Sequence, residues 1–294
     1  RNKSLPLALG QAFKNAGYTT RAYHNFNGDY YGRLESHPNL GYDYKGLGFG
    51  LELQRQMPTS DLEMAQASID ACLNDEHFHL YYLTMSGHML YDFKHNAMAK
   101  KHRDRIPKTF SGTEAAASYL ASQVELDEML KYLIERLNAA GRLDDTVFCI
   151  SGDHYPYGLS DKDLLSFLSP EEISDPFARY KSSLILWSSS MKSAIEVNKL
   201  LAAVDVLPSL YNLFSIPYDP RFLAGRDFAS SEPGRVCFAN LSFIEEGIGY
   251  FDALSERHSG DRARLHEAVL AHSAEFDLSY RILERDYYRE SLQI

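Results

Sequence analysis

Short apolar runs alternate along this chain with longer segments in which apolar residues recur at every third or fourth position. Runs of about four to eight residues that are rich in aromatic and β-branched side chains are typical of buried strands. They occur in the segments TTRAYH (19–24), HFHLYYLTMSGH (77–88), TVFCIS (146–151), KSSLILWSS (181–189) and GRVCFANLSFI (234–244). Strands that alternate with helices predict an α/β fold with a mostly parallel central sheet.

Three helices are predicted at the start, the middle and the end of the chain. The first covers residues 4–16, with Pro6 in its first turn and Gly17 as its C-terminal stop. The segment 205–214 predicts a helix that begins near an aspartate. Residues 260–290 predict a long amphipathic helix.

Two further helices are indicated by capping-box spacing, in which a side chain at each helix start satisfies a free backbone N–H. Ser60 and Glu63 have this spacing at the start of the segment 60–73. Ser111 and Glu114 have it at the start of a helix that ends at Gly141. The predicted apolar face of this second helix consists of Leu120, Val124, Leu130, Leu133, Ile134 and Leu137.

The segments between these elements predict loops. Residues 25–50 are rich in Gly, Tyr and Asn and predict a long loop, which in compact domains is usually functional. Residues 92–110 are polar and basic. No internal repeat, low-complexity tract or linker divides the sequence, so residues 1–294 are predicted to form one domain.

Composition narrows the classes of function. The chain has 294 residues and a formal net charge of −10, which argues against a general nucleic-acid binder and against a polybasic membrane-surface module. The three cysteines, Cys72, Cys149 and Cys237, have no disulfide or zinc spacing. The sequence contains no signal peptide and no run of about 18 apolar residues that would span a bilayer.

Histidines close three of the predicted strands. His24 and His88 each follow a strand, and a third strand ends in the pair Asp153–His154. In an open α/β sheet, ligands bind beyond the carboxyl ends of the strands, so these side chains are candidates for one site. A carboxylate beside an imidazole suits Mn²⁺, Zn²⁺ or Mg²⁺.

Structural interpretations of the same residues remain open at this point. An Asp–His pair at one strand end is more often a turn and a cap than a metal site. His24 alone is typical of a hydrogen-bonded histidine at the core rim, and His88 after Ser-Gly is typical of a turn. Arg33 has two tyrosines nearby, Tyr30 and Tyr31, on which it can stack without touching a ligand.

Four blocks of the sequence resemble the lipoteichoic acid synthase family, whose members are sulfatase-like enzymes of the alkaline phosphatase superfamily. The blocks follow one another in family order, and the resemblance extends over about residues 6–255. They are AYHNFNGDYYGRLESHPNLGYD (22–43), YYLTMSGHMLYDFKHNAMAKKH (81–102), DDTVFCISGDHYPYG (144–158) and DVLPSLYNLFSIPYDPRFLAGRD (205–227).

The resemblance implies an α/β/α sandwich and a metal-dependent transferase at the extracellular face of the cell membrane. Such enzymes move glycerol phosphate from an anionic phospholipid head group, that of phosphatidylglycerol, onto a glycerol phosphate polymer or glycolipid. The implied cofactor is Mn²⁺, with Mg²⁺ or Zn²⁺ as alternatives. Implied metal ligands are Asp153 and His154, implied catalytic residues are His24, Arg33 and His88, and implied substrate contacts are Tyr30 and Tyr31.

This sequence departs from the family pattern at its start. The family's Glu ligand and Thr nucleophile precede the block that begins here near residue 6. We therefore expect an N-terminally incomplete catalytic domain that lacks its first strand or strands and is inactive by itself. The parent protein is expected to be membrane-anchored.

Two other classes of function remain open at the level of sequence. The first alternative is a phosphoethanolamine transferase, a phosphodiesterase or a sulfatase of the same superfamily. A catalytically inactive domain that binds a polyanionic polymer or a partner protein is the second alternative.

Overall fold

The structure is a computed structural model that describes residues 3–291. Its internal contacts divide it into two compact units. The larger unit is Phe13–Lys192, and the smaller unit combines the residues up to Ala12 with those from Ser193 onward. The single domain expected from the sequence stays a prediction.

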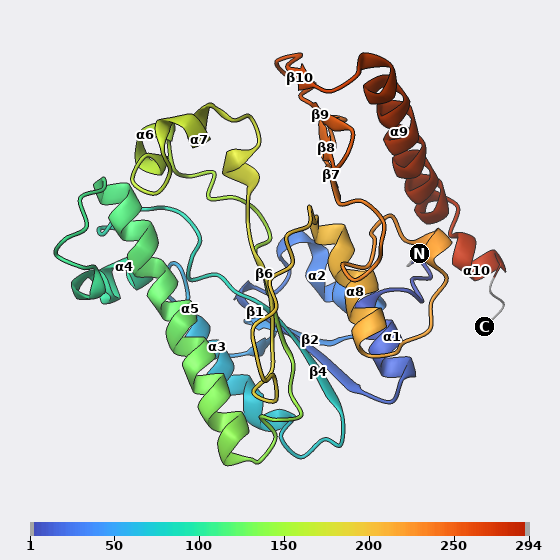
Figure 1. Ribbon diagram of the computed structural model, residues 1–294. Helices are drawn as coiled ribbons and strands as arrows, with labels where there is room; N and C mark the ends of the chain where they lie inside the picture. The colour runs from blue at the N-terminus through green and yellow to red at the C-terminus, as the bar shows by residue number, and fades with distance from the viewer. Residues whose placement is uncertain (1–2, 292–294) are drawn as a thin grey trace. The chain divides into compact units, whose positions relative to one another are not determined.

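The larger unit contains most of the helices and strands foreseen from the hydrophobic pattern (Figure 1). Its strands are β1 Thr19–Asn27, β2 Asp43–Leu47, β3 Gly50–Leu51, β4 Phe78–Leu83, β5 Phe148–Ser151 and β6 Leu184–Trp187. Its α-helices are α2 Arg33–Asn39, α3 Asp61–Ser68, α4 Ala97–Lys101, α5 Glu114–Ala139, α6 Asp161–Leu164 and α7 Pro170–Ser174, and α1 Leu9–Asn15 lies at its boundary. Short 3-10 turns are η1 Tyr30–Gly32, η2 Ile69–Ala71, η3 Arg103–Arg105 and η4 Ala178–Tyr180.

Four of these strands form a parallel sheet in the order β3-β2-β1-β4, which confirms the predicted α/β class. The strand β1 lies between β2 and β4, and its middle is buried while its two ends are exposed. His24 is in register with Gly46 of β2 and Leu83 of β4. Because the strands are parallel, their polar carboxyl ends lie at one edge of the sheet.

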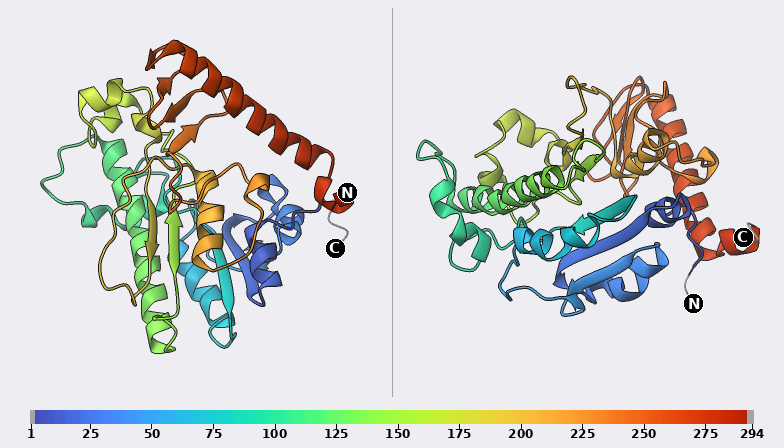
Figure 2. Two further views of the ribbon diagram at one scale, coloured as in Figure 1. Left: turned by 45° about the vertical axis from the view of Figure 1, so that its right-hand side comes forward. Right: turned by 90° about the horizontal axis from the view of Figure 1, so that it is seen from below.

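Helices α3 and α5 cover one face of this sheet (Figure 2). The core beneath them includes Tyr23 of β1, Met64 and Ile69. Met129 and Leu133 contribute the α5 side, and each of these five side chains is at most 5% exposed. Burial of such apolar side chains stabilises the fold by about 1.5–3 kcal/mol each.

The buried face of α5 differs from the one that hydrophobicity predicts. Leu133 and Leu137 are buried as expected, but Leu120, Val124, Leu130 and Ile134 are only half-buried. The helix instead buries small and polar side chains, among them Ala121, Ser122 and Glu125. Small residues on this face allow α3 and α4 to approach α5 closely. The face that packs is therefore set by side-chain size as well as by hydrophobicity.

Strands β5 and β6 pair antiparallel, apart from the four-stranded sheet. Phe148 is opposite Trp187 and Ser151 is opposite Leu184. Both strands were expected to belong to the mostly parallel sheet, so their pairing corrects that detail while the parallel character of the four-stranded sheet stands. The pair still presents the Asp153–His154 dipeptide directly after β5.

Local boundaries correct three further expectations. The segment 25–50 is no uniform loop, because it contains η1, α2, β2 and β3. Helix α5 is capped by Thr113, whose hydroxyl accepts from the Ala116 N–H, and not by Ser111. Ser60 does cap α3 as predicted, since its hydroxyl accepts from the Glu63 N–H at 3.0 Å. Helix α1 is shorter than residues 4–16.

The smaller unit carries a second sheet, which is antiparallel and has the order β10-β9-β8-β7. Its strands are β7 Arg235–Cys237, β8 Phe243–Glu245, β9 Gly249–Phe251 and β10 His258–Ser259, where the sequence predicted one late strand. Its helices are α8 Val206–Leu213, α9 Arg262–Glu284 and α10 Tyr287–Ser291, with 3-10 turns η5 Ala203–Asp205 and η6 Pro220–Phe222. Within this unit α9 packs on the sheet through Phe243, Leu265 and Ala268. None of the helices in residues 3–291 has the length and apolar character that a membrane span requires.

The half-buried histidine His79 makes the stability of the larger unit depend on pH. Its ring stacks on Phe13 with centroids 4.6 Å apart, and its Nε2 lies 3.0 Å from the Tyr42 hydroxyl. Burial lowers the pKa of His79 to about 4. Between the unfolded value near 6.5 and this folded value, the unfolded chain binds a proton that the folded chain does not, so stability falls as the pH falls.

We therefore expect the free energy of unfolding to decrease between about pH 6.5 and pH 4, by up to about 1.4 kcal/mol per pH unit from this histidine. A His79→Gln variant should show a shallower decrease, while His77→Gln, at an exposed neighbouring position, should match the original slope. Denaturant unfolding at a series of pH values measures this. Equal slopes in all three proteins would contradict the assignment.

Candidate active site

The candidate catalytic, substrate-binding and metal-binding residues from the sequence all lie in the larger unit. His24 is in β1, His88 follows β4, and Asp153 and His154 follow β5. Arg33 opens helix α2, directly after the turn η1. The fold thus brings residues that are far apart in the sequence to the ends of neighbouring elements.

Three histidines at these strand ends share one hydrogen-bonding arrangement. His24 Nδ1 lies 2.9 Å from the Leu83 carbonyl oxygen, and His88 Nδ1 lies 3.0 Å from that of Met89. His154 Nδ1 lies 2.9 Å from the Tyr155 carbonyl oxygen. A carbonyl oxygen can only accept, so each Nδ1 is the donor in its hydrogen bond. The backbone therefore orients all three rings and leaves Nε2 as the ring nitrogen that makes other contacts.

His88 and His154 lie close to each other although they follow different strands. Their ring centroids are 6.1 Å apart, with the rings nearly perpendicular. Tyr157 joins them, since its hydroxyl lies 3.2 Å from His88 Nε2 and its ring is 4.9 Å from that of His154. Sequence reasoning did not single out Tyr157, although it stands three residues after His154 in the conspicuous GDHYPYG stretch.

His24 is buried, with 5% of its surface exposed. Burial lowers its pKa, the hydrogen bond to Leu83 opposes this, and the Arg33 charge lowers it further. A ring that is neutral at pH 7 and has Nδ1–H committed presents Nε2 as an acceptor. Such a ring suits a substrate hydroxyl better than a phosphate oxygen.

Arg33, Tyr30 and Tyr31 form a group beside His24, in which both tyrosines are exposed and Arg33 is half-buried. The Arg33 guanidinium carbon lies 5.9 Å from the Tyr30 ring centroid and 5.3 Å from that of Tyr31. Arg33 Nη1 donates to the Tyr30 carbonyl oxygen at 2.9 Å. Tyr31 is 80% exposed and adopts a φ of 59°, a costly backbone conformation for a non-glycine residue. The turn thereby holds two aromatic rings toward solvent beside the half-buried arginine.

Asp153 and His154 supply the right kinds of donor for a divalent ion but not a closed set. His154 Nε2 lies 3.7 Å from Asp153 Oδ2, and the side chains are 40% and 88% exposed, respectively. Among residues 3–291 there is no group of three His, Cys, Asp or Glu side chains arranged to bind a metal. Catalytic sites usually use three protein ligands. The described residues therefore fit an ion only as two of its ligands.

Two more residues of this region escaped the sequence interpretation. The ring of His37, on α2, is parallel to that of Tyr81 with centroids 6.3 Å apart. Burial, with smaller contributions from Arg33 and His24, lowers the pKa of His37 to about 4. Burial raises the pKa of Tyr81, with Asp153 acting in the same direction and Arg33 against it. Tyr81 therefore lies within electrostatic reach of both Asp153 and Arg33.

Comparison with known proteins agrees with the resemblance inferred from the sequence. The Sulfatase family model matches residues 3–216. The curated lipoteichoic acid synthase of Staphylococcus saprophyticus is 24% identical over 255 residues, covering 84% of this chain and 38% of the relative. Lipoteichoic acid synthase 1 of Bacillus subtilis is 22% identical over 274 residues, covering 90% and 41%. The chain thus spans about two fifths of the length of these curated relatives.

Solved structures confirm the fold. The lipoteichoic acid synthase LtaP from Listeria monocytogenes superposes with a TM-score of 0.76 at 17% identity, covering 96% of this chain and 74% of that one. A protein of the alkaline phosphatase superfamily from Vibrio parahaemolyticus gives 0.64 at 11% identity, covering 95% and 69%. At these identities the likeness establishes the architecture and leaves the chemistry to the residues themselves.

Proposed function

Because this chain belongs to the sulfatase family, we propose that its larger unit carries the substrate-binding part of a phosphotransferase site. The transferred group is glycerol phosphate, the donor is an anionic phospholipid head group, and the acceptor is a glycerol phosphate polymer or glycolipid. The curated relatives named lipoteichoic acid synthase support this choice of chemistry.

The observation that carries the proposal is the shared orientation of His24, His88 and His154. Each ring fixes Nδ1–H on a backbone carbonyl and presents Nε2. A site that handles a phosphodiester with free hydroxyls needs such acceptors beside a cation.

Arg33 is the cation that recognises the phosphate. A guanidinium grips two phosphate oxygens at once, and the contact of Arg33 with Tyr30 leaves it further N–H donors for that purpose. Tyr30 and Tyr31 pack against the glycerol. His24 Nε2 accepts from a glycerol hydroxyl, while His88, with Tyr157 as its hydrogen-bond partner, contacts the phosphate from the side of β5.

Asp153 and His154 would bind Mn²⁺, or Mg²⁺ or Zn²⁺, as two of its ligands. When bound, such an ion stabilises negative charge on the phosphoryl group. Two donors bind an ion weakly, and none of the residues assigned here is a nucleophile. We therefore infer that the 294-residue chain alone does not complete the transfer. Sustained release of glycerol phosphate from phosphatidylglycerol by this chain would refute that inference.

The surroundings of the site follow from the same proposal. We place the protein at the extracellular face of the cell membrane, with its substrates in the outer leaflet and the cell envelope. The net charge of −10 makes Arg33 important, because the chain as a whole repels an anionic substrate.

An Arg33→Ala variant is expected to bind glycerol phosphate about ten to a hundred times more weakly, because it loses charged hydrogen bonds to the phosphate. Isothermal titration calorimetry with glycerol phosphate measures the change. Arg103→Ala is the matched control, since Arg103 also lies over an aromatic ring, that of Phe93 at 4.7 Å, but outside the site. Equal binding by both variants would refute the role of Arg33.

A further inference from the structure

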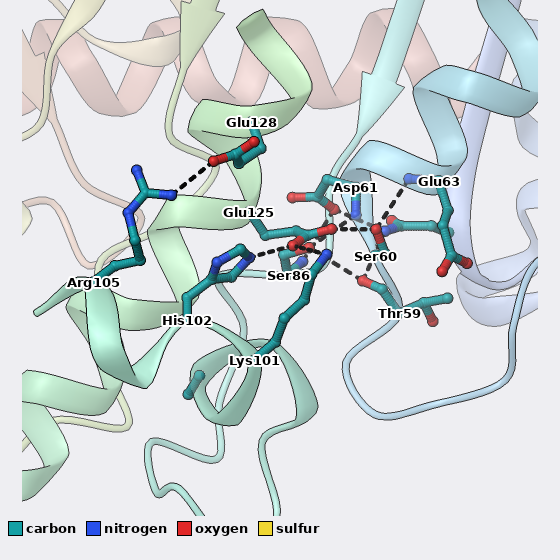
Figure 3. A network of polar contacts seen from close by, with 12 residues as sticks. Thr59, Ser60, Asp61, Glu63, Ser86, Lys101, His102, Arg105, Glu125 and Glu128 are labelled. Atoms are coloured by element: carbon teal, nitrogen blue, oxygen red, sulfur yellow. Dashed lines mark hydrogen bonds and ion pairs between the residues drawn. The ribbon is translucent and has the colours of Figure 1, made fainter. Parts of the chain in front are cut away.

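Two adjacent residues at the start of α3, Ser60 and Asp61, are each 1% exposed and belong to a buried polar network (Figure 3). Ser60 is connected to helix α5, because its hydroxyl donates to Glu125. Asp61 is connected instead to the sheet. One short segment of chain therefore makes two separate sets of polar contacts with neighbouring elements.

The Asp61 carboxyl group joins the ends of two parallel strands. Its Oδ1 accepts from Asn25 Nδ2 at 2.7 Å, from the Met85 N–H at 2.8 Å and from the Ser86 N–H at 3.1 Å. The Asp61 N–H in turn donates to Ser86 Oγ at 2.9 Å. Asn25 belongs to β1, and Met85 and Ser86 follow β4.

The residues that Asp61 contacts adjoin the proposed catalytic histidines. Asn25 is the neighbour of His24, and Ser86 precedes His88 by two positions. We propose that Asp61 is a positioning residue that fixes the placement of His24 relative to His88. This inference rests on the proposed function, because those two rings are assigned there to the substrate.

Two oxygens of this group suggest that Asp61 is in its acid form. Asp61 Oδ2 and Asn25 Oδ1 are buried and have no hydrogen-bond partner among residues 3–291. A proton on Oδ2 would convert it into a donor for Asn25 Oδ1 and complete a paired acid–amide contact. Burial raises the pKa of Asp61, although the hydrogen bonds from Met85, Ser86 and Asn25 oppose the shift. A buried carboxylate with an unsatisfied oxygen would be costly.

The two sets of contacts provide a matched control. Ser60 and Asp61 are equally buried neighbours, and Ser60 also caps α3. Ser60→Ala should therefore lower the thermal midpoint without moving the strand ends. Asp61→Ala should lower it and also displace His24 and His88, whereas Asp61→Asn should restore them, because an amide supplies both the acceptor and the donor.

The experiment compares the ¹H–¹³C signals of the His24 and His88 rings in the free 294-residue chain, followed by titration with glycerol phosphate. In Asp61→Ala both ring signals should shift and the affinity should fall about tenfold, the effect of about one hydrogen-bonded contact. In Ser60→Ala and Asp61→Asn the ring signals should stay at their original positions. If Asp61→Ala does not fold, Asp61→Ser, whose shorter side chain loses the bridge between Asn25 and Met85, should show the same shifts.

The outcomes separate this inference from the proposed function. Unmoved ring signals in Asp61→Ala or Asp61→Ser, or equal shifts in Ser60→Ala, would overturn the positioning role. Shifts in Asp61→Asn as large as those in Asp61→Ala would overturn the acid form. Failure of the unsubstituted chain to bind glycerol phosphate would count against the proposed function alone, since the ring signals of the free chain still test Asp61.

Discussion

Replacing Glu125 by alanine is expected to lower the free energy of unfolding by about 3–5 kcal/mol, since it breaks a buried charged network. Glu125 has no exposed surface. Its carboxylate accepts from the Ser60 hydroxyl, from Lys101 Nζ at 2.8 Å and from His102 Nε2. Burial by itself would raise the pKa of Glu125, but these hydrogen bonds outweigh it and lower the pKa. The network thus keeps a charge inside the protein.

The loss arises from the partners that alanine leaves behind. Lys101 is 47% exposed at its side chain and can return to water, but Ser60 and His102 are buried and lose their acceptor. Urea unfolding at pH 7 measures the effect as a change in midpoint at constant slope. Glu128→Ala is the matched control on the next turn of α5: loss of its exposed pair with Arg105, at 2.9 Å, should change the stability far less. Similar stabilities of the two variants would contradict the importance of the network.

Removing His154 or Asp153 is expected to abolish detectable Mn²⁺ binding by this chain. With two donors in place binding is already weak, and loss of one donor should weaken it more than the roughly 10–100-fold that loss of an outer partner costs in complete sites. Water-proton relaxation or electron paramagnetic resonance of free Mn²⁺ measures the change in His154→Ala and Asp153→Ala.

A second exposed acid–imidazole pair supplies the control for that experiment. His95 Nδ1 lies 3.1 Å from Asp92 Oδ2. The other oxygen, Asp92 Oδ1, already accepts from two backbone N–H groups, those of Lys94 and His95. His95→Ala should leave Mn²⁺ binding unchanged. If Mn²⁺ binding persists in His154→Ala and Asp153→Ala but disappears in His95→Ala, the ion binds at Asp92 and His95, and the assignment to Asp153 and His154 is wrong.

The parallel strands and the identity of the strand-end residues could be predicted because they depend on local signals. An apolar run followed by a polar residue located β5 and the Asp153–His154 pair after it, but β1 continues through His24 to Asn27, and β4 ends at Leu83, before His88. Helix α3 could be predicted because a serine cap acts over three residues. The family resemblance then assigned chemistry to positions that the pattern had only located.

What could not be predicted depends on contacts between distant segments. A hydrophobic pattern cannot predict that Glu125 on α5 is buried, because its burial depends on hydrogen bonds from Ser60, Lys101 and His102 in other elements. The role of Tyr157 depends on its contact with His88, and that contact exists only after β4 and β5 are placed. The antiparallel pairing of β5 and β6 is likewise a property of register and not of composition.

The central claim is that the ends of β1, β4 and β5 form one site for glycerol phosphate. The most direct test follows the histidine ring signals of the unsubstituted chain while glycerol phosphate is added. The proposal predicts that the signals of His24 and His88 shift together and saturate at one concentration, while those of the exposed His77 and His95 stay in place. Saturable binding that leaves His24 and His88 unmoved would contradict it.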